Sequence, residues 1–398
     1  MEVLRIGIVG AGHMGRIRAQ SAQAHPECRV VQVVDPVSER AEALAKEVGC
    51  EAGADWERLV ARRDLDAVVV ATPHKHLAPI TIAALQTGKH VFCEKPMART
   101  VAEADEVLKC HRSNPQVLVV GFTLRHHPAI ARARELLLEG AIGDPFFIRG
   151  CYGHGGRPGY EREWRADAEA AGGGELLDQG IHLIDLSRWF LGEFSETAGF
   201  TATYFWGSEK RLDDAGPGGR TPVEDNGFVL LRTEEGRVAS LHASWTQWKN
   251  LFRFEVFGRE GFLTIEGLGG SYGPERLVIG RRLFLGKPPE VVELTFSEDG
   301  LRAEGRGPAS CGALRAVGEF PASPTVWAGE WAAFVASIRA HESASSAGAD
   351  HEHRVTVERG VDSCPSAGAL DARQALRIVH VPYAVPGRKV LTAPLDHV

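Results

Sequence analysis

The residues best suited to chemistry lie in a segment that follows three consecutive glycines, Gly172–Gly174. Asp178 and His182 stand four residues apart, so they share one face if the segment is helical, and Asp185 follows three residues later. An imidazole can accept a hydroxyl proton near neutral pH. A carboxylate one turn away can either steer that imidazole or hold a substrate hydroxyl. The alternative is an ordinary helix with a satisfied histidine, and Asp185 fits such a structural role best.

A second reactive group is the lysine of Glu94-Lys95-Pro96, which follows the apolar run Val91–Cys93. Pro96 cannot continue a strand ladder and restricts Lys95 to extended geometry, which would fix the direction of the ammonium group. A positive charge beside a reacting oxygen stabilises the alkoxide that develops there. Lysine and histidine together suit hydride transfer from an alcohol carbon, since that reaction leaves a hydroxyl proton to be removed.

The N-terminal segment has the pattern of a dinucleotide-binding turn. Gly10, Gly12 and Gly15 follow an apolar run and open a predicted helix. These glycines allow a tight turn, a close approach of the pyrophosphate to the backbone, and close packing of helix on strand. His13 and Met14 begin the helix, whose free N–H groups would face the phosphates. The context predicts a nucleotide site rather than a purely structural turn.

The acid at position 35 predicts which nucleotide is bound. Asp35 ends the next apolar run, 20 residues past Gly15. A carboxylate there binds the ribose 2′-hydroxyl and repels a 2′-phosphate, so the sequence favours NAD over NADP. Arg40, five residues further on, could soften that preference.

A fourth segment ends another apolar run at Val70. Thr72 and Pro73 follow it, at the C-terminal end of a predicted strand, where open α/β sheets bind ligands. His74 and His76 either flank the nicotinamide or simply begin the next helix.

The elements that must position these groups alternate along the first 122 residues. Short apolar runs predict strands buried on both faces, at 3–9, 30–34, 67–71, 91–93 and 117–120. Amphipathic segments such as Ser38–Glu47 and Val101–Cys110 separate them. This order predicts a doubly wound parallel sheet covered by helices, in an N-terminal domain over residues 1–122.

The pattern changes over residues 123–398, which we assign to a second, α+β domain. Helices are predicted at 128–138, 176–190, 327–340 and 371–380, with a strand at 145–152. Residues 196–296 predict a meander of strands, hence a large open, mostly antiparallel sheet. Residues 300–325 and 341–366 lack periodicity and are predicted to be loops.

Composition excludes several classes of protein. A net charge of −7 over 398 residues, without a basic stripe, argues against a nucleic-acid partner. No apolar run reaches membrane-spanning length, and the first strand begins without a signal peptide. Seven scattered cysteines without a C-x-x-C pair suit a reducing compartment, so we expect a cytoplasmic protein. No H-E-x-x-H or paired-cysteine spacing supports a metal site.

With these motifs in order, the chain resembles the glucose–fructose oxidoreductase / inositol dehydrogenase / rhizopine-catabolism (Gfo/Idh/MocA) family. The resemblance covers roughly residues 1 to 265. It rests on the glycine loop Gly10–Gly15, on Glu94-Lys95-Pro96, on Gly121-Phe122 with Arg125 and Pro128, on Trp164-Arg165, and on the triple glycine through Asp178, His182 and Asp185.

The resemblance implies a Rossmann domain followed by an open-sheet domain, a nicotinamide cofactor, and sugar-like substrates. It makes Lys95 the catalytic or substrate-polarising lysine and His182 the acid–base group, with Asp178 binding substrate or steering the histidine. It also implies that Arg125 contacts substrate, and it suggests that further residues contact the cofactor: Thr72, Pro73, His76, Glu94, Lys95, Trp164 and Arg165.

We therefore expect an NAD-dependent dehydrogenase acting on a secondary alcohol of a sugar, cyclitol or amino-sugar derivative. Two alternatives remain open: a keto-sugar or aldose reductase or a redox-assisted glycoside-processing enzyme, and a non-catalytic sensor that binds NAD or a sugar. An antiparallel sheet with one apolar face needs a cover, so we expect a homodimer or homotetramer formed through the C-terminal sheet.

Overall fold

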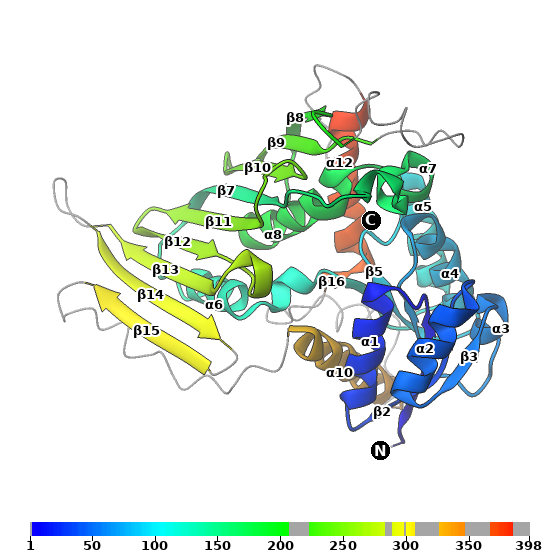
Figure 1. Ribbon diagram of the computed structural model, residues 1–398. Helices are drawn as coiled ribbons and strands as arrows, with labels where there is room; N and C mark the ends of the chain where they lie inside the picture. The colour runs from blue at the N-terminus through cyan, green and yellow to red at the C-terminus, as the bar shows by residue number, and fades with distance from the viewer. Residues whose placement is uncertain are drawn as a thin grey trace. The chain divides into compact units, whose positions relative to one another are not determined.

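The computed structural model describes residues 2–206, 223–282, 289–297, 300–306, 326–346 and 367–384. The chain forms two compact units (Figure 1). Unit 1 contains residues 1–126, 169–172 and 324–376, and unit 2 contains residues 127–168, 173–323 and 377–398. The main break at His126 lies close to the expected boundary at residue 122, but the sequence did not predict the return of residues 324–376 to unit 1.

Unit 1 holds the parallel sheet that the sequence predicted. Its strand order is β16-β6-β5-β4-β1-β2-β3, and all neighbours pair in parallel except β16, which runs antiparallel to β6. The strands are β1 (Leu4–Val9), β2 (Cys28–Val34), β3 (Glu51–Gly53), β4 (Ala67–Val70), β5 (His90–Glu94), β6 (Leu118–Gly121) and β16 (Ala367–Gly368).

Helices cover this sheet, because each crossover between parallel strands needs one. They are α1 (His13–Ala24), α2 (Ser38–Val48), α3 (Trp56–Val60), α4 (His74–Gln86), α5 (Val101–Ser113) and α10 (Val326–Ser346), with the 3₁₀ turn η1 (Thr123–His126). Helix α10 packs on α1 and places Trp331 and Phe334 against Phe92 of β5 (Figure 1). These fully buried rings explain why α10 belongs to unit 1.

Unit 2 holds the mostly antiparallel sheet. Its order is β15-β14-β13-β12-β11-β7-β10-β9-β8, and only β7 and β10 pair in parallel among the described strands. The strands are β7 (Pro145–Gly153), β8 (Glu196–Ala202), β9 (Asn226–Arg232), β10 (Val238–Ser244), β11 (Leu251–Gly258), β12 (Gly261–Glu266), β13 (Glu275–Arg281), β14 (Glu290–Ser297) and β15 (Gly300–Arg306).

One face of the unit 2 sheet is covered by helices, with α8 (Ile181–Leu191) on β7 and β10 and α6 (Pro128–Leu138) on β12 to β14 (Figure 1). A π-helical segment, η4 (Leu176–Gly180), leads directly into α8. The remaining elements are the 3₁₀ turns η2 (Tyr160–Arg162), η3 (Trp164–Ala166) and η6 (Gly270–Tyr272), and the helices α7 (Ala168–Ala171) and α12 (Ala369–Ala384). Each of these two helices has residues in both units.

Two expected loops begin inside regular structure. Residues 300–306 form the edge strand β15, and residues 341–346 extend α10. The sequence signal was weak in both places because these residues are mostly small or polar and show little apolar periodicity. Pairing with β14 orders residues 300–306, and residues 341–346 continue a helix that is already formed, which adds hydrogen bonds without a new nucleus. The rest of both expected loops, 307–325 and 347–366, lies outside the described residues.

None of the described helices is both long enough and apolar enough to cross a bilayer.

Candidate functional site

In unit 1, the glycine loop has the geometry expected of a dinucleotide turn. A Cβ on Gly10 would lie 2.4 Å from the carbonyl oxygen of Ala71, and one on Gly15 would lie 1.8 Å from the carbonyl oxygen of Gly10. A Cβ on Gly12, by contrast, would meet no atom within 4 Å. The first and third glycines are therefore required by the fold, while the second leaves the open approach that a pyrophosphate needs.

Helix α1 begins at His13 with Gly12 as its N-cap, and no side chain caps its free amides. Asp35 follows β2 and is buried. Its carboxylate accepts hydrogen bonds from the amide of Ala11 at 2.8 Å and from that of Val37 at 2.9 Å. Asp35 thus fixes the glycine loop, and the open amides of this loop and of the start of α1 fit a dinucleotide. Contact of Asp35 with a ribose stays a prediction. Arg40 lies exposed on α2.

The segment after β4 also fits a bound cofactor. The hydroxyl of Thr72 is buried and has no hydrogen-bond partner, which is the state of a group that awaits a ligand atom. Pro73 is the N-cap of α4. His74 is buried and its Nδ1 lies 2.8 Å from the carbonyl oxygen of Ala171, so it has a structural role. His76 is exposed on the first turn of α4 and stays a candidate for the cofactor.

Lys95 is partly exposed directly after the last residue of β5. The backbone around it is tightly held, since Met97 is fully buried in a left-handed conformation (φ 73°) and its amide donates to the carbonyl of Glu94. Glu94 itself is buried, and its Oε1 accepts a 2.7 Å hydrogen bond from Nε of Arg18.

Arg18 is fully buried and links α1 to two other elements of unit 1. Its Nη1 lies 2.6 Å from Glu330 of α10, and its guanidinium stacks over Phe92 at 4.4 Å. Burial alone would lower the pKa of Arg18, but Glu330 and Glu94 raise it, so the charge is kept. Glu94, which was predicted to contact the cofactor, therefore pairs with Arg18. This ion pair fixes the backbone at the start of Glu94-Lys95-Pro96.

Arg125, predicted to contact substrate, is buried in η1. Its Nη2 lies 3.6 Å from the carboxylate of Asp371. This placement within unit 1 favours a structural role for Arg125.

In unit 2, Asp178 and His182 are both buried and lie in consecutive helical segments, η4 and α8. The sequence treated them as neighbours on one regular α-helix. In the structure the turn that carries Asp178 is π-helical, a geometry that is frequent at functional sites. Asp185, one turn further on, is almost fully buried, in line with the structural role expected of it.

Arg165 is the ionic partner of Asp178. Its Nε lies 3.3 Å from Oδ2 of Asp178, and its guanidinium stacks on Trp164 at 4.5 Å. Burial by itself would lower the pKa of Arg165, whereas Asp178, Tyr160 and Glu163 raise it. Arg165 thus holds the carboxylate of Asp178 within unit 2, and Trp164 packs against its guanidinium. Contact of Trp164 and Arg165 with the cofactor stays a prediction.

The sequence did not predict two tyrosines of unit 2, one beside His182 and the other beside the first. The ring of Tyr152, on β7, lies 6.2 Å from the imidazole of His182 and 5.6 Å from the ring of Tyr272 in η6. Tyr152 and Gln179 both hydrogen-bond to Tyr272. Burial raises the pKa of Tyr152 well above its ordinary value, so its hydroxyl stays protonated and remains a donor. Strand alternation in 145–152 could have indicated Tyr152, but only the tertiary structure identifies Tyr272.

His154 was also missed. Burial lowers its pKa, and Asp178 opposes that shift, which places the imidazole within electrostatic range of the carboxylate. Its Nδ1 accepts a hydrogen bond from the amide of Gly156 at 2.9 Å. The neutral imidazole is therefore the form that holds this glycine-rich turn beside Asp178.

Two carboxylates of residues 153–171 have arginine partners. Glu163 pairs with Arg157 and Arg165, and Glu161 pairs with Arg162. These pairs favour a structural role for both carboxylates. Among the described residues, no group of three or more His, Cys, Asp or Glu side chains is placed to hold a metal ion.

Comparison with known proteins gives this architecture its family. Residues 4–122 match an oxidoreductase family with an NAD-binding Rossmann fold, and residues 130–264 match the Gfo/Idh/MocA C-terminal domain. Levoglucosan dehydrogenase of Pseudarthrobacter phenanthrenivorans is 32% identical over 288 residues, which cover 66% of this chain and 73% of that protein. Inositol 2-dehydrogenase of Rhizobium meliloti is 30% identical over 272 residues, which cover 68% and 76%.

Solved structures share the fold. An oxidoreductase domain protein from Kribbella flavida aligns with a TM-score of 0.76 and 25% identity over 99% of this chain and 100% of that one. Levoglucosan dehydrogenase in complex with NADH and L-sorbose aligns with a TM-score of 0.71 over 96% of both chains, at 24% identity. The molecule is thus an NAD-binding oxidoreductase. It belongs to the Gfo/Idh/MocA family, as the motifs in its sequence indicated.

Proposed function

We propose that this protein is an NAD-dependent dehydrogenase that transfers a hydride between the nicotinamide and a secondary alcohol or ketone of a sugar, cyclitol or amino-sugar derivative. The observation that carries the proposal is that Asp178 and His182 are both buried in consecutive helical segments, with Asp178 paired to Arg165 and His182 bordered by Tyr152, in a chain whose other unit is an NAD-binding Rossmann domain. The names of the relatives, which include enzymes for levoglucosan and inositol, support a sugar-like substrate.

Bound NAD would supply the hydride acceptor, held by the glycine loop and Asp35. In alcohol oxidation, His182 accepts the hydroxyl proton as the carbon gives up its hydride, so the alcohol becomes a ketone and the imidazole becomes imidazolium. The ammonium of Lys95 stabilises the negative charge that develops on the oxygen. The carboxylate of Asp178 is already paired with Arg165, and it can stabilise the imidazolium or hold a neighbouring substrate hydroxyl.

NAD is proposed in preference to NADP because Asp35 is a buried carboxylate at the end of β2. Its negative charge suits a free 2′-hydroxyl and opposes a 2′-phosphate. A cytoplasmic location is proposed as well, since the five cysteines that the structure describes are all free thiols.

A panel of polyols tests the proposal directly. Purified protein is incubated with NAD or NADP and with levoglucosan, myo-inositol, 1,5-anhydro sugars or aldoses, and the absorbance of reduced nicotinamide is followed. We expect at least one sugar-like alcohol to be oxidised with NAD, and His182→Ala to be inactive on the same substrate. Absence of turnover in either direction, with NADH binding intact, would support the alternative of a non-catalytic sensor.

A second candidate function uses the same chemistry without net oxidation. The 2,7-anhydro-N-acetylneuraminate hydratase of Escherichia coli is 30% identical over 275 residues, which cover 68% of this chain and 67% of that protein. A transient oxidation would then labilise a glycosidic or ether bond. Product formation from an anhydro sugar without accumulation of NADH would favour this candidate over the dehydrogenase.

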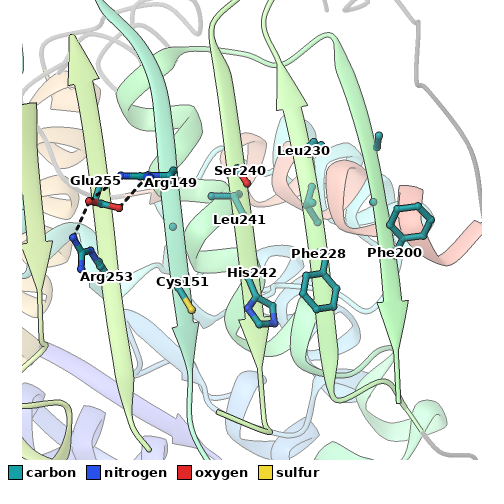
Figure 2. A pocket seen from close by; sticks show the side chains of 14 residues that line it. Arg149, Cys151, Phe200, Phe228, Leu230, Ser240, Leu241, His242, Arg253 and Glu255 are labelled. Atoms are coloured by element: carbon teal, nitrogen blue, oxygen red, sulfur yellow. Dashed lines mark hydrogen bonds and ion pairs between the residues drawn. The ribbon is translucent and has the colours of Figure 1, made fainter. Parts of the chain in front are cut away.

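The oligomer is proposed to form through the open face of the unit 2 sheet. Side chains that alternate along β7 to β11 line a shallow depression of about 450 Å³ there (Figure 2). Phe200 and Leu230 on this face are 61% and 53% exposed, and Phe228 stacks on His242 at 4.2 Å. A face this apolar favours coverage by a second copy, because such large exposed patches mark interfaces.

Sedimentation velocity tests the oligomer. We expect a dimer or tetramer, and Leu230→Lys together with Phe200→Lys should shift it toward monomer because two buried charges would face each other. A wild-type monomer at micromolar concentration would contradict the proposed assembly.

A further inference from the structure

The turn before the Asp178 segment is held by a buried carboxylate from another part of the chain. Glu224 lies just before β9. Its Oε2 accepts a hydrogen bond from the amide of Gly174 at 2.9 Å, and its Oε1 accepts one from the amide of Leu176 at 3.1 Å. Its own carbonyl oxygen accepts from the amide of Glu175 at 3.1 Å. Three successive amides at the start of the helical segment therefore point at one residue.

The hydroxyl of Tyr383, near the end of α12, completes this arrangement. It donates a 2.6 Å hydrogen bond to Oε1 of Glu224. Glu224 thus connects the end of the last described helix to the turn that begins η4, although 159 residues separate it from Tyr383.

Two of the three consecutive glycines are explained by this contact. A Cβ on Gly173 would lie 2.6 Å from the hydroxyl oxygen of Tyr383. A Cβ on Gly174 would lie 1.9 Å from the carbonyl oxygen of Glu224 and 2.8 Å from its carboxyl group. Any side chain at either position would push Tyr383 and Glu224 away from the backbone that they hold.

We propose that Glu224 and Tyr383 are positioning residues, which fix the turn of the helical segment from which Asp178 and His182 act. The inference rests on the proposed dehydrogenase function, because it assigns a role toward those two residues. The mechanical link is short: the amide of Asp178 donates to the carbonyl of Gly174 at 2.9 Å, and the amide of Gly174 is held by Glu224. A shift of the turn would move the carboxylate of Asp178 directly.

The ionisation of Glu224 affects this role. Burial raises the pKa of Glu224 to about 7, while Tyr383 and the amides of Gly174 and Leu176 act in the opposite direction. Among the described residues, Tyr383 is the titratable side chain that faces it, and burial together with Glu224 keeps the pKa of Tyr383 well above its ordinary value. The ionised carboxylate accepts all three hydrogen bonds, from the amides of Gly174 and Leu176 and from the hydroxyl of Tyr383. The protonated acid carries an O–H that donates, and of these three groups the hydroxyl oxygen of Tyr383 is the one able to accept it.

The test compares Glu224→Gln and Tyr383→Phe with the wild type on the best substrate of the polyol panel. We expect Glu224→Gln to lower kcat about 10- to 100-fold, with the Kd for NADH unchanged, because a displacement of about 1 Å at a reacting group costs rate rather than cofactor binding. In the wild type, alcohol oxidation should fall as the pH drops through about 7. Tyr383→Phe should move that fall to higher pH, since the tyrosine lowers the pKa of Glu224.

Glu275→Gln is the matched control. Glu275 is also a buried carboxylate of unit 2, and it accepts a hydrogen bond from the amide of Ala129 at 2.6 Å at the start of α6. This variant should lose thermal stability but keep the wild-type kcat and pH profile. An equal loss of kcat in Glu275→Gln, or unchanged kcat and pH profile in both test variants, would overturn the positioning role.

Hydrogen–deuterium exchange separates this inference from the proposed function. Amides in residues 173–178 should exchange faster in Glu224→Gln than in the wild type, whether or not a sugar is oxidised. Faster exchange without any sugar oxidation would contradict the dehydrogenase proposal and still support the positioning contact. Normal sugar oxidation with unchanged exchange and unchanged kcat would contradict the positioning contact and leave the dehydrogenase proposal intact.

Discussion

The nucleotide site of unit 1 and the acid–base site of unit 2 are built in different ways. The first is made of backbone: three glycines, the uncapped start of α1 and one carboxylate lie within residues 10–35. The second is made of side chains from well-separated elements: Asp178 and His182 are buried, and half-buried Tyr152 on β7, Arg165 on η3 and Tyr272 on η6 lie near them.

The difference follows from what each site has to bind. A phosphate group is recognised by main-chain N–H groups, which any sequence supplies once the glycines allow the turn. A proton acceptor has to be held in one orientation and in one charge state, and that requires neighbouring charges and burial. Variants of unit 1 glycines should therefore change cofactor binding, whereas variants around Asp178 should change turnover.

Lys95 tests this contrast most strongly, because it lies in unit 1 and yet is proposed to act on the reacting oxygen. Lys95→Ala should lower kcat by roughly two or more powers of ten, as removal of one preorganised electrostatic group does, with the Kd for NADH nearly unchanged. Lys95→Arg should not restore the rate, because a planar guanidinium cannot replace a compact ammonium. Steady-state kinetics and NADH fluorescence titration measure both quantities. Normal turnover in Lys95→Ala would show that Lys95 has a structural role and does not act on the reacting oxygen.

Variants of His182 and Asp178 test whether the side chains of unit 2 control turnover. Oxidation by the wild type should slow at low pH because a protonated imidazole accepts no proton, and His182→Ala should lower kcat about 100-fold and remove its part of that pH dependence. Asp178→Asn should be milder, acting on kcat if the carboxylate steers His182 and on KM if it holds substrate. The pH–rate profiles of the three proteins measure this. A low-pH fall that is unchanged in His182→Ala and also persists when Glu224→Gln is added would point to another base.

Two substitutions in the glycine loop, Gly12→Ala and Gly15→Ala, can be compared directly. Gly12→Ala should fold as the wild type does, since its Cβ meets no protein atom within 4 Å, and it should bind NADH about 10-fold more weakly because the methyl group occupies the pyrophosphate approach. Gly15→Ala should lower the Tm as well, because its Cβ would lie 1.8 Å from the carbonyl oxygen of Gly10. Thermal melts and calorimetric titration measure the two effects. Wild-type NADH affinity in Gly12→Ala would break the assignment of the loop.

The smallest effect expected is on the pH dependence of stability. Burial raises the pKa of Glu224 from 4.5 to about 7, so the folded protein binds this proton more tightly than the unfolded chain does. Its contribution to stability is complete below about pH 4.5 and is lost as the pH rises to about 7. Glu224→Gln should therefore show a smaller loss of Tm over that range. Identical Tm–pH curves for the two proteins would mean that Glu224 is not buried in the way described.

Much of unit 1 could be predicted from the sequence because its signals are local. The strand at Val3–Val9, the glycines after it and the acid at Asp35 lie within one β-α-β unit, and the structure places them as expected. The family followed from the same motifs together with Glu94-Lys95-Pro96, and the comparisons confirm it. The roles assigned to Lys95, Asp178 and His182 are untested and stay proposals.

Long-range partners could not be predicted, because no local pattern specifies them. Nothing near Glu94 in the sequence indicates that it pairs with Arg18, 76 residues away, and nothing near Gly174 indicates Glu224. Both pairs are set by how strands and helices pack, which decides which charges are buried together.

The sequence by itself thus determined the class of protein, the cofactor-binding fold and the residue types available for chemistry. These properties depend on local backbone geometry and hydrophobic periodicity, which residues close together in the sequence specify. Only the tertiary structure decided the surroundings of those residues: the π-helical turn that carries Asp178, the salt bridge from Arg165, and the contact of Glu224 and Tyr383 with the triple glycine. The physical reason is that desolvation and charge pairing depend on distances across the fold, which the order of residues along the chain does not fix.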